Sequence, residues 1–220
     1  MIRLRVSDLD SWQAYADPQF EDAGIDLEEL LRRLRREEIE KPPIMRAGSA
    51  LHSFLEHARA GDTVGSHNGV IVDRVCLRFD TDFDLVLPAE REPAIIEHTF
   101  ETPSGPVLLR GRIDARDNDP WSTITDYKLS QSFSAERYAR SPQWKAYSLM
   151  AGAKRFRYLI FESKQDLVLD VDFEIDVYVH DVHELVFWPY PEMEQEVKEV
   201  VCELAAFVKQ YVPGLVEGRR

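Results

Sequence analysis

Residues 111–128 read GRIDARDNDPWSTITDYK, two apolar runs separated by a polar turn. Asp114 closes the first run, and Asp126 and Lys128 stand near the end of the second. Side chains alternate faces along a strand at about 3.3 Å per residue, so Asp126 and Lys128 should point the same way about 6–7 Å apart. We expect a hairpin between the two runs to bring Asp114 beside them. Two carboxylates and a lysine on one face favour a hard-cation site and phosphodiester hydrolysis.

The sequence around this stretch predicts an α/β fold. Runs rich in β-branched and aromatic residues predict strands over 70–79, 94–101, 107–115, 122–129, 156–162 and 167–180. Apolar stripes and capping signals predict helices over 7–16, 27–39, 47–59, 142–151 and 191–211, with a short helix or turn at 134–139. Lys41-Pro42-Pro43 should stop the second helix. This order describes a mixed central β-sheet flanked by helices.

The length of 220 residues fits one domain. We divide it into a core of about 45–162, N-terminal helices over 5–40, and a C-terminal strand and helix over 165–212. A hydrophobic fraction of 44% is ordinary for a packed core. No repeat or low-complexity linker interrupts the chain.

The sequence predicts a reduced, cytoplasmic protein that does not cross a membrane. No run of 18 apolar residues occurs, and charges interrupt the N-terminal MIRLRVSDLDSW, which is not typical of a signal peptide. The two cysteines, Cys76 and Cys202, cannot form a four-cysteine zinc or iron–sulfur site. We expect both to be core residues.

The charge balance bears on possible partners. Forty acidic residues against 27 basic ones give a formal net charge of −13, which argues against nucleic acid. Screening acts over about 8–10 Å, however, so a local basic patch still works on an acidic protein. The candidate clusters are Arg32, Arg33, Arg35 and Arg36, and then Arg137, Arg140 and Lys145. Acidic neighbours make a solvated helix face the alternative interpretation of the first cluster.

Taken together with the segments on either side, GRID and DYK resemble the PD-(D/E)XK nuclease superfamily, and more narrowly its RecB-like exonuclease branch. The motifs follow the family's order over roughly residues 5–162. They are Gly48 and His52 in G-x-x-x-H, a strand acid at Glu97, Asp114 of GRID, Asp126 and Lys128 of DYK, and Gln143 and Tyr147 in Q-x-x-x-Y. The resemblance implies a restriction-endonuclease-like core, without the iron–sulfur cluster of many relatives.

The resemblance also implies a role for each matching residue. Asp114 and Asp126 would hold Mg²⁺ or Mn²⁺, which prefer oxygen ligands, together with the backbone carbonyl of Tyr127. His52 would add a ligand that shifts the preference toward Mn²⁺. Lys128 would orient the attacking water or offset charge on the phosphate. Gln143 and Tyr147 would flank the site and hold Lys128 or the DNA backbone.

Each of these residues alone has an ordinary structural explanation. His52 suits the edge of an amphipathic helix, and Gln143 with Tyr147 suits a helix face. Their occurrence in order is what favours the family. For Glu97 two interpretations stay open, a further acid near the metal or a solvent-facing strand residue.

We therefore expect a metal-dependent DNA exonuclease acting on DNA ends, in phage-type recombination, replication or repair. It would work in the cytoplasm of a bacterial or phage-infected cell, with a recombination or single-strand-binding protein or a second copy as candidate partners. Three alternatives stay open: a structure-specific or single-strand endonuclease, a non-catalytic nucleic-acid or partner-binding module on the same fold, and a scaffold whose acidic surface binds a basic partner.

Overall fold

The computed structural model describes residues 1–17, 24–37, 41–57, 69–79, 94–167 and 172–215, and every structural statement below refers to these ranges. The helices are α1 (Val6–Ala16), α2 (Leu27–Arg35), α3 (Pro43–His57), α4 (Ala135–Arg140), α5 (Pro142–Ala151) and α6 (Met193–Tyr211). The strands are β1 (Ile2–Arg5), β2 (Val70–Val72), β3 (Val75–Phe79), β4 (Ala94–Phe100), β5 (Val107–Ile113), β6 (Ala115–Arg116), β7 (Ile124–Ser130), β8 (Phe156–Leu167) and β9 (Ile175–Phe187).

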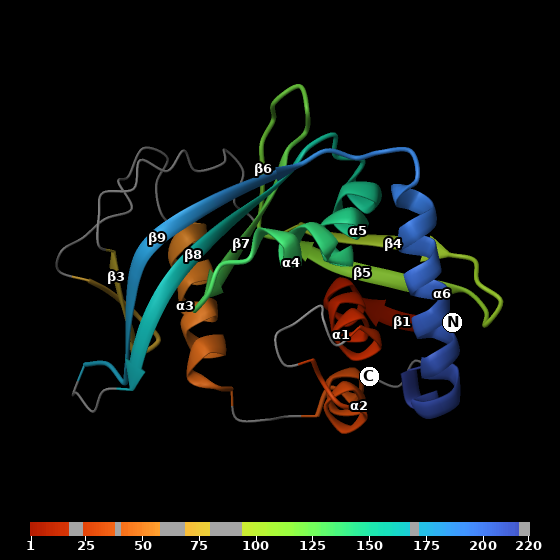
Figure 1. Cartoon of the computed structure of the whole chain (residues 1–220), viewed down its shortest axis with the longest axis horizontal. Helices are drawn as coiled ribbons and strands as arrows, with labels where there is room; N and C mark the ends of the chain where they lie inside the picture. Colours follow the sequence, from red (N-terminus) through yellow and green to blue (C-terminus); the bar gives the residue numbers. More distant parts are fainter. Residues whose placement is uncertain (18–23, 38–40, 58–68, 80–93, 168–171, 216–220) are drawn as a thin grey trace.

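The strands form two sheets (Figure 1). A three-stranded sheet has the order β1-β5-β4, and a six-stranded sheet has the order β2-β3-β9-β8-β7-β6. Parallel pairs join β1 to β5, β3 to β9 and β7 to β8, whereas the remaining neighbours are antiparallel. This mixed α/β architecture confirms the predicted fold class.

Helices cover the sheets from different sides. One apolar cluster joins α1, α2, α5 and α6 to the three-stranded sheet and to β8, and includes Leu109, Tyr147, Phe156 and Val201. A second cluster packs α3 onto the six-stranded sheet, through Leu51 and Leu55 against strand residues such as Tyr127. The helices therefore pack on the sheets through two separate apolar clusters. No helix is both long enough and apolar enough to cross a membrane in the part of the chain described.

The expected hairpin between 107–115 and 122–129 is wrong for most of its length. β5 pairs with β1 and β4, and the chain then bends at Asp114. Only β6 continues toward β7, with the two pairs Ala115–Thr125 and Arg116–Ile124. The apolar run up to Ile113 is buried against helices of the other layer, which draws β5 into the three-stranded sheet.

Several further expectations need adjustment. The second helix, expected over 27–39, ends at Arg35, because Arg36 adopts a left-handed conformation before Lys41-Pro42-Pro43 is reached. The strand expected over 167–180 is instead β9, which runs from Ile175 to Phe187, while Leu167 ends β8 and residues 168–171 lie outside the described ranges.

The run 70–79 is a hairpin, since Asp73 and Arg74 both have positive φ and turn the chain between β2 and β3. Strand β1 was not predicted. Helix α3 starts at Pro43, because a proline in the first turn lacks an N–H that the helix does not use.

Candidate active site

Strand β7 positions the D-x-K pair. Its residues alternate faces, so Asp126 and Lys128 point the same way, and Lys128 Nζ lies 2.8 Å from Asp126 Oδ2. Asp126 is buried, with only 4% of its surface exposed, whereas Lys128 is partly buried. The expected shared face of these two residues is confirmed, and they form a charged pair at low exposure.

Asp114 joins this pair through the backbone of β7. Because β6 pairs only with Ile124 and Thr125, no strand neighbours β7 on this edge beyond Thr125 among the described residues. The Tyr127 N–H instead donates to Asp114 Oδ2 over 2.9 Å. The N–H and carbonyl of one strand residue point to the same edge, so the Tyr127 carbonyl lies on the Asp114 side. This placement suits the expected backbone ligand.

His52 approaches Asp114 from helix α3. Leu51 and Leu55 bury one side of the helix against the six-stranded sheet, which leaves His52 at the edge of that contact. Its Nδ1 lies 3.3 Å from Asp114 Oδ1. Two ligand atoms of one octahedral Mg²⁺ or Mn²⁺ ion also lie about 3 Å apart. The His52–Asp114 geometry therefore fits adjacent ligands of a single divalent ion.

The charges of the site influence one another. Burial raises the pKa of Asp126 to about 6, with help from the Asp114 carboxylate and against the effect of Lys128. Burial alone would lower the pKa of Lys128, but the Asp126 carboxylate has the opposite effect and the pKa of the ammonium group is raised. Burial alone would raise the pKa of Asp114 and lower that of His52. The contact between the two side chains acts in the opposite direction, and as a result the pKa of Asp114 is lowered and that of His52 is raised. A buried carboxylate with a raised pKa is a common mark of a cation or catalytic site.

Helix α5 places Tyr147 against GRID. The helix starts with Ser141 as N-cap and Pro142 in its first turn. A Cβ built on Gly111 would lie 2.4 Å from Tyr147 Cε1, so this contact requires glycine. Burial, and next the Asp126 charge, raise the pKa of Tyr147, which keeps its hydroxyl neutral.

Gln143, one turn before Tyr147 on α5, lies near Lys128 of the D-x-K pair. Its side chain is buried, and its Oε1 has no hydrogen-bond partner among the described residues. It lines a pocket of about 230 Å³ together with Lys128, Arg137 and Ser141. A buried unpaired acceptor beside an ammonium group is available for substrate, water or the lysine itself.

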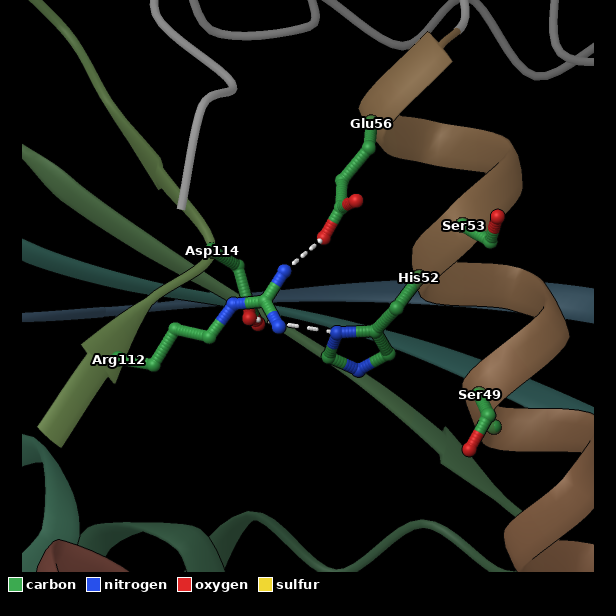
Figure 2. Close-up of a pocket in the computed structure, with 7 residues that line it drawn as sticks. Ser49, His52, Ser53, Glu56, Arg112 and Asp114 are labelled. Carbon is green, nitrogen blue, oxygen red and sulfur yellow. Dashed lines mark hydrogen bonds and ion pairs between the residues drawn. The ribbon is translucent and has the colours of Figure 1, made fainter. Parts of the chain in front are cut away.

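A larger cleft of about 420 Å³ lies between α3 and β5, and we call it the α3–β5 cleft. Figure 2 shows its two walls, one formed by α3 and the other by β5 and Asp114. Arg112 reaches across to Glu56, with 2.9 Å between Nη2 and Oε1. The lining residues on α3 are Gly48, Ser49, His52, Ser53 and Glu56. A Cβ on Gly48 would meet nothing within 4 Å, so this glycine opens the cleft rather than serving packing.

The expected site residues gather around the free edge of β7, but they do not line one cavity. His52 and Asp114 line the α3–β5 cleft, Lys128 and Gln143 line the 230 Å³ pocket, and Tyr147 lines a third pocket of about 260 Å³. Asp126 faces Lys128 rather than His52 in this arrangement. The hydrogen bond between Asp114 and the Tyr127 N–H is what links the two halves.

Glu97 is placed apart from these residues. It lies opposite Arg110 in the β4–β5 pair, and its Oε1 is 3.5 Å from Arg110 Nε. Arg110 precedes Asp114 by four residues, or about 13 Å along a strand. Both partners are about half exposed, with side-chain exposures of 48% for Glu97 and 56% for Arg110. Of the two interpretations left open for Glu97, this position favours the solvent-facing one.

The sequence did not reveal one cluster of side chains of the kinds that bind metal ions. Glu162, Asp181 and His183 each offer an atom within 4.8 Å of the others. Asp181 and His183 share a face of β9, and Glu162 is opposite Asp181 on β8, a register that the sequence does not reveal. His183 Nε2 lies 2.7 Å from Glu162 Oε2, and its ring stacks on Phe133. These contacts account for the cluster, so we assign it no part in the catalytic site.

Solved structures resemble this chain to different extents. A candidate exonuclease from Eubacterium rectale superposes with a TM-score of 0.53 at 13% identity, over 97% of this chain and 82% of the other. The alkaline exonuclease LHK-Exo from Laribacter hongkongensis gives a TM-score of 0.46 at 13% identity, over 98% and 94% of the two chains. No curated protein matches the sequence.

The match of the sequence to a family model is decisive. The model describes the PD-(D/E)XK nuclease superfamily and matches residues 13–211, nearly the full length. The matched region includes His52, Asp114, Asp126 and Lys128, which are the residues expected from the motifs. The chain therefore belongs to the PD-(D/E)XK nuclease superfamily.

Proposed function

We propose that this chain is a metal-dependent deoxyribonuclease of the RecB-like branch that hydrolyses phosphodiester bonds from DNA ends. One observation carries the proposal. Asp114 is held by the Tyr127 N–H of the D-x-K strand, and His52 stands 3.3 Å from the same carboxylate. Acid, histidine and lysine from separate elements are thus gathered at the one open edge of β7.

The donor set fits a divalent metal. Asp114, Asp126, the Tyr127 carbonyl and His52 would hold Mg²⁺ or Mn²⁺, as members of this superfamily generally use divalent metals. Such an ion would lower the pKa of a bound water molecule and would offset negative charge on the phosphate. In the structure one oxygen of Asp126, Oδ2, lies 2.8 Å from Lys128 Nζ, so the ion would compete with the lysine for this carboxylate.

Lys128 has the role of a fixed positive charge. In the metal-free arrangement the Asp126 carboxylate raises the pKa of the Lys128 ammonium against the effect of burial, which favours a protonated lysine that donates hydrogen bonds. A protonated lysine at this position orients a water molecule or stabilises charge that develops on a phosphate oxygen. Gln143 lines one pocket with Lys128, and Tyr147 packs on Gly111, three residues before Asp114.

The test is a cleavage assay with three DNA forms. Linear duplex, closed circular and single-stranded DNA are incubated in Mg²⁺, in Mn²⁺ and in EDTA, beside a Lys128→Ala variant. The matched control is Lys164→Ala, an exposed lysine on the neighbouring strand β8. The proposal expects metal-dependent loss of linear DNA by the native protein and the control, and none by Lys128→Ala.

Other outcomes distinguish the alternatives. Cleavage of closed circles would replace exonuclease by endonuclease action, since a circle has no end. Absence of cleavage by the native protein in both metals would contradict the enzyme proposal and favour a binding module. A role in recombination, replication or repair is the context that the RecB-like resemblance supports, with a recombination or single-strand-binding protein as a partner.

A further inference from the structure

The exposed face of the three-stranded sheet carries four arginines. Arg3 and Arg5 lie on β1, and Arg110 and Arg112 lie on β5. All four are exposed, whereas the residues between them, such as Leu4 and Leu109, are buried under the helices. We call this surface the arginine face.

The sheet register places these side chains on one side. Arg5 pairs with Arg110 and Arg3 with Leu108 in the parallel β1–β5 ladder, and directly paired residues share a face. Arg112 follows Arg110 at the next position of that face. From the level of Arg3 to Asp114 the strand rises over six residues, or about 20 Å.

Most basic residues of the two clusters that the sequence suggested for nucleic-acid binding form ion pairs with acidic residues in the structure. Arg32 and Arg33 both contact Glu29, and Arg36 makes two hydrogen bonds to the buried Asp8. Two members of the second cluster are paired likewise, Arg140 with Asp17 and Lys145 with Glu196. These ion pairs leave little unpaired charge for phosphate in the two clusters, apart from Arg137, which lines the pocket with Lys128 and Gln143.

The arginine face is different in this respect. Arg3 and Arg5 make no ion pair with any residue that the structure describes. Arg110 and Arg112 have one acid each at the border, Glu97 at 3.5 Å and Glu56 at 2.9 Å, and both arginines are more than half exposed. On a chain of net charge −13, this sheet surface has more arginines than acids.

The arginine face leads directly into the α3–β5 cleft. Arg112 lines both that cleft and the 260 Å³ pocket that includes Arg5 and Arg110. In Figure 2, Arg112 extends from its strand past Asp114 toward Glu56. A bound chain that follows β5 would therefore arrive at Asp114 and His52.

We propose that the arginine face binds the phosphodiester backbone of the DNA strand that enters the α3–β5 cleft. The proposal rests on the proposed nuclease function and adds the path of the substrate. Guanidinium groups bind phosphate oxygens in a fork geometry, and DNA advances about 3.4 Å per phosphate, so 20 Å corresponds to roughly six nucleotides. Contacts to the backbone alone imply binding without sequence preference.

The test measures DNA affinity in EDTA, where binding is separated from cleavage. Fluorescence anisotropy with a labelled 20-nucleotide strand and its duplex is recorded from 50 to 300 mM NaCl. The variant is Arg3→Gln with Arg5→Gln, and the control of equal charge is Arg32→Gln with Arg33→Gln on α2. Each lost phosphate contact lowers the slope of log affinity against log salt by about 0.7–0.9. We expect a slope lower by about 1.4–1.8 and roughly tenfold weaker binding at low salt for the variant, but not for the control.

A second variant gives an effect of the opposite sign. Glu97→Gln removes an acid from the arginine face and leaves Arg110 unpaired, so DNA binding should become tighter. Equal affinity and equal slope for the native protein and the Arg3/Arg5 variant would overturn the proposal. That result is separate from failure of the nuclease function, because the cleavage assay on the native protein reports that function independently.

Discussion

Gly111 and Tyr147 occupy one another's space so closely that no side chain fits between them. A Cβ on Gly111 would lie 2.4 Å from Tyr147 Cε1 and 2.8 Å from Val6 Cγ2. GRID and Q-x-x-x-Y are therefore parts of one contact, although 36 positions separate them along the chain. The contact fixes β5 against α5 just before Asp114.

Gly111→Ala should destabilise the protein and reduce hydrolysis together. The added methyl group forces Tyr147 or β5 to move, and such overpacking costs about 1–3 kcal/mol. Urea unfolding and DNA cleavage measured on the same preparation check this. A variant as stable and as active as the native protein would contradict the described contact.

Gly48→Ala should behave in the opposite way in the unfolding experiment. A Cβ at Gly48 meets nothing within 4 Å, and replacing glycine by alanine inside a helix adds about 0.5–1 kcal/mol of stability. The methyl group nevertheless enters the α3–β5 cleft one turn before His52, so DNA cleavage should fall. A higher urea midpoint with unchanged kcat/KM would show that substrate does not approach this part of α3.

Asp126→Asn should stabilise the metal-free protein at high pH. Burial raises the folded-state pKa of Asp126 to about 6, above the unfolded value near 3.9, so the folded state binds its proton more tightly. Its contribution to stability is then fully present below about pH 4 and is lost as the pH rises through 6. A shift of about two units corresponds to about 3 kcal/mol.

The measurement for Asp126→Asn is thermal unfolding in EDTA at pH 5 and pH 8. We expect a higher melting temperature for the variant at pH 8 and a difference about half as large at pH 5, which lies between the two pKa values. Adding Mn²⁺ at pH 8 should stabilise the native protein more than the variant, because ligand binding to the folded state raises stability. A variant that melts earlier than the native protein at pH 8 without metal contradicts the assigned pKa direction.

His52→Ala should weaken Mn²⁺ binding more than Mg²⁺ binding. Imidazole nitrogen is a better ligand for Mn²⁺ than for the strictly oxygen-seeking Mg²⁺. Loss of even an outer-shell partner commonly costs about 10–100-fold in metal affinity, so a lost ligand should cost at least tenfold for Mn²⁺. Isothermal titration with each metal checks this, with His57→Ala on the same helix as the control, since His57 bonds the Ser53 carbonyl instead. Equal losses for the two metals would remove His52 from the ligand set.

The sequence predicted those features that depend on local geometry. Alternation along one strand was enough to place Asp126 and Lys128 on a shared face, and four-residue spacing was enough to place Gln143 and Tyr147 on α5. Motif order also led to the superfamily, which the match over residues 13–211 supports.

Features that depend on distant pairing were not predicted. The choice of β1 and β4 as partners of β5 comes from burial of Leu109 and Ile113 under helices far away in sequence. Strand β1 was missed because its four residues precede a helix directly, and its register with β5 is a tertiary fact. The arginine face could not be seen for the same reason, since it needs that register.

The bend at Asp114 makes this residue a pivot. β5 ends at Ile113 and β6 begins at Ala115. The link between these two strands, which belong to different sheets, is therefore a single residue, Asp114. The two walls of the α3–β5 cleft belong to different sheets, since α3 packs on the six-stranded one and Arg112 stands on the three-stranded one. Any change in the angle between the sheets therefore alters the aperture of the cleft, while Asp114 remains fixed to β7 by its bond to Tyr127.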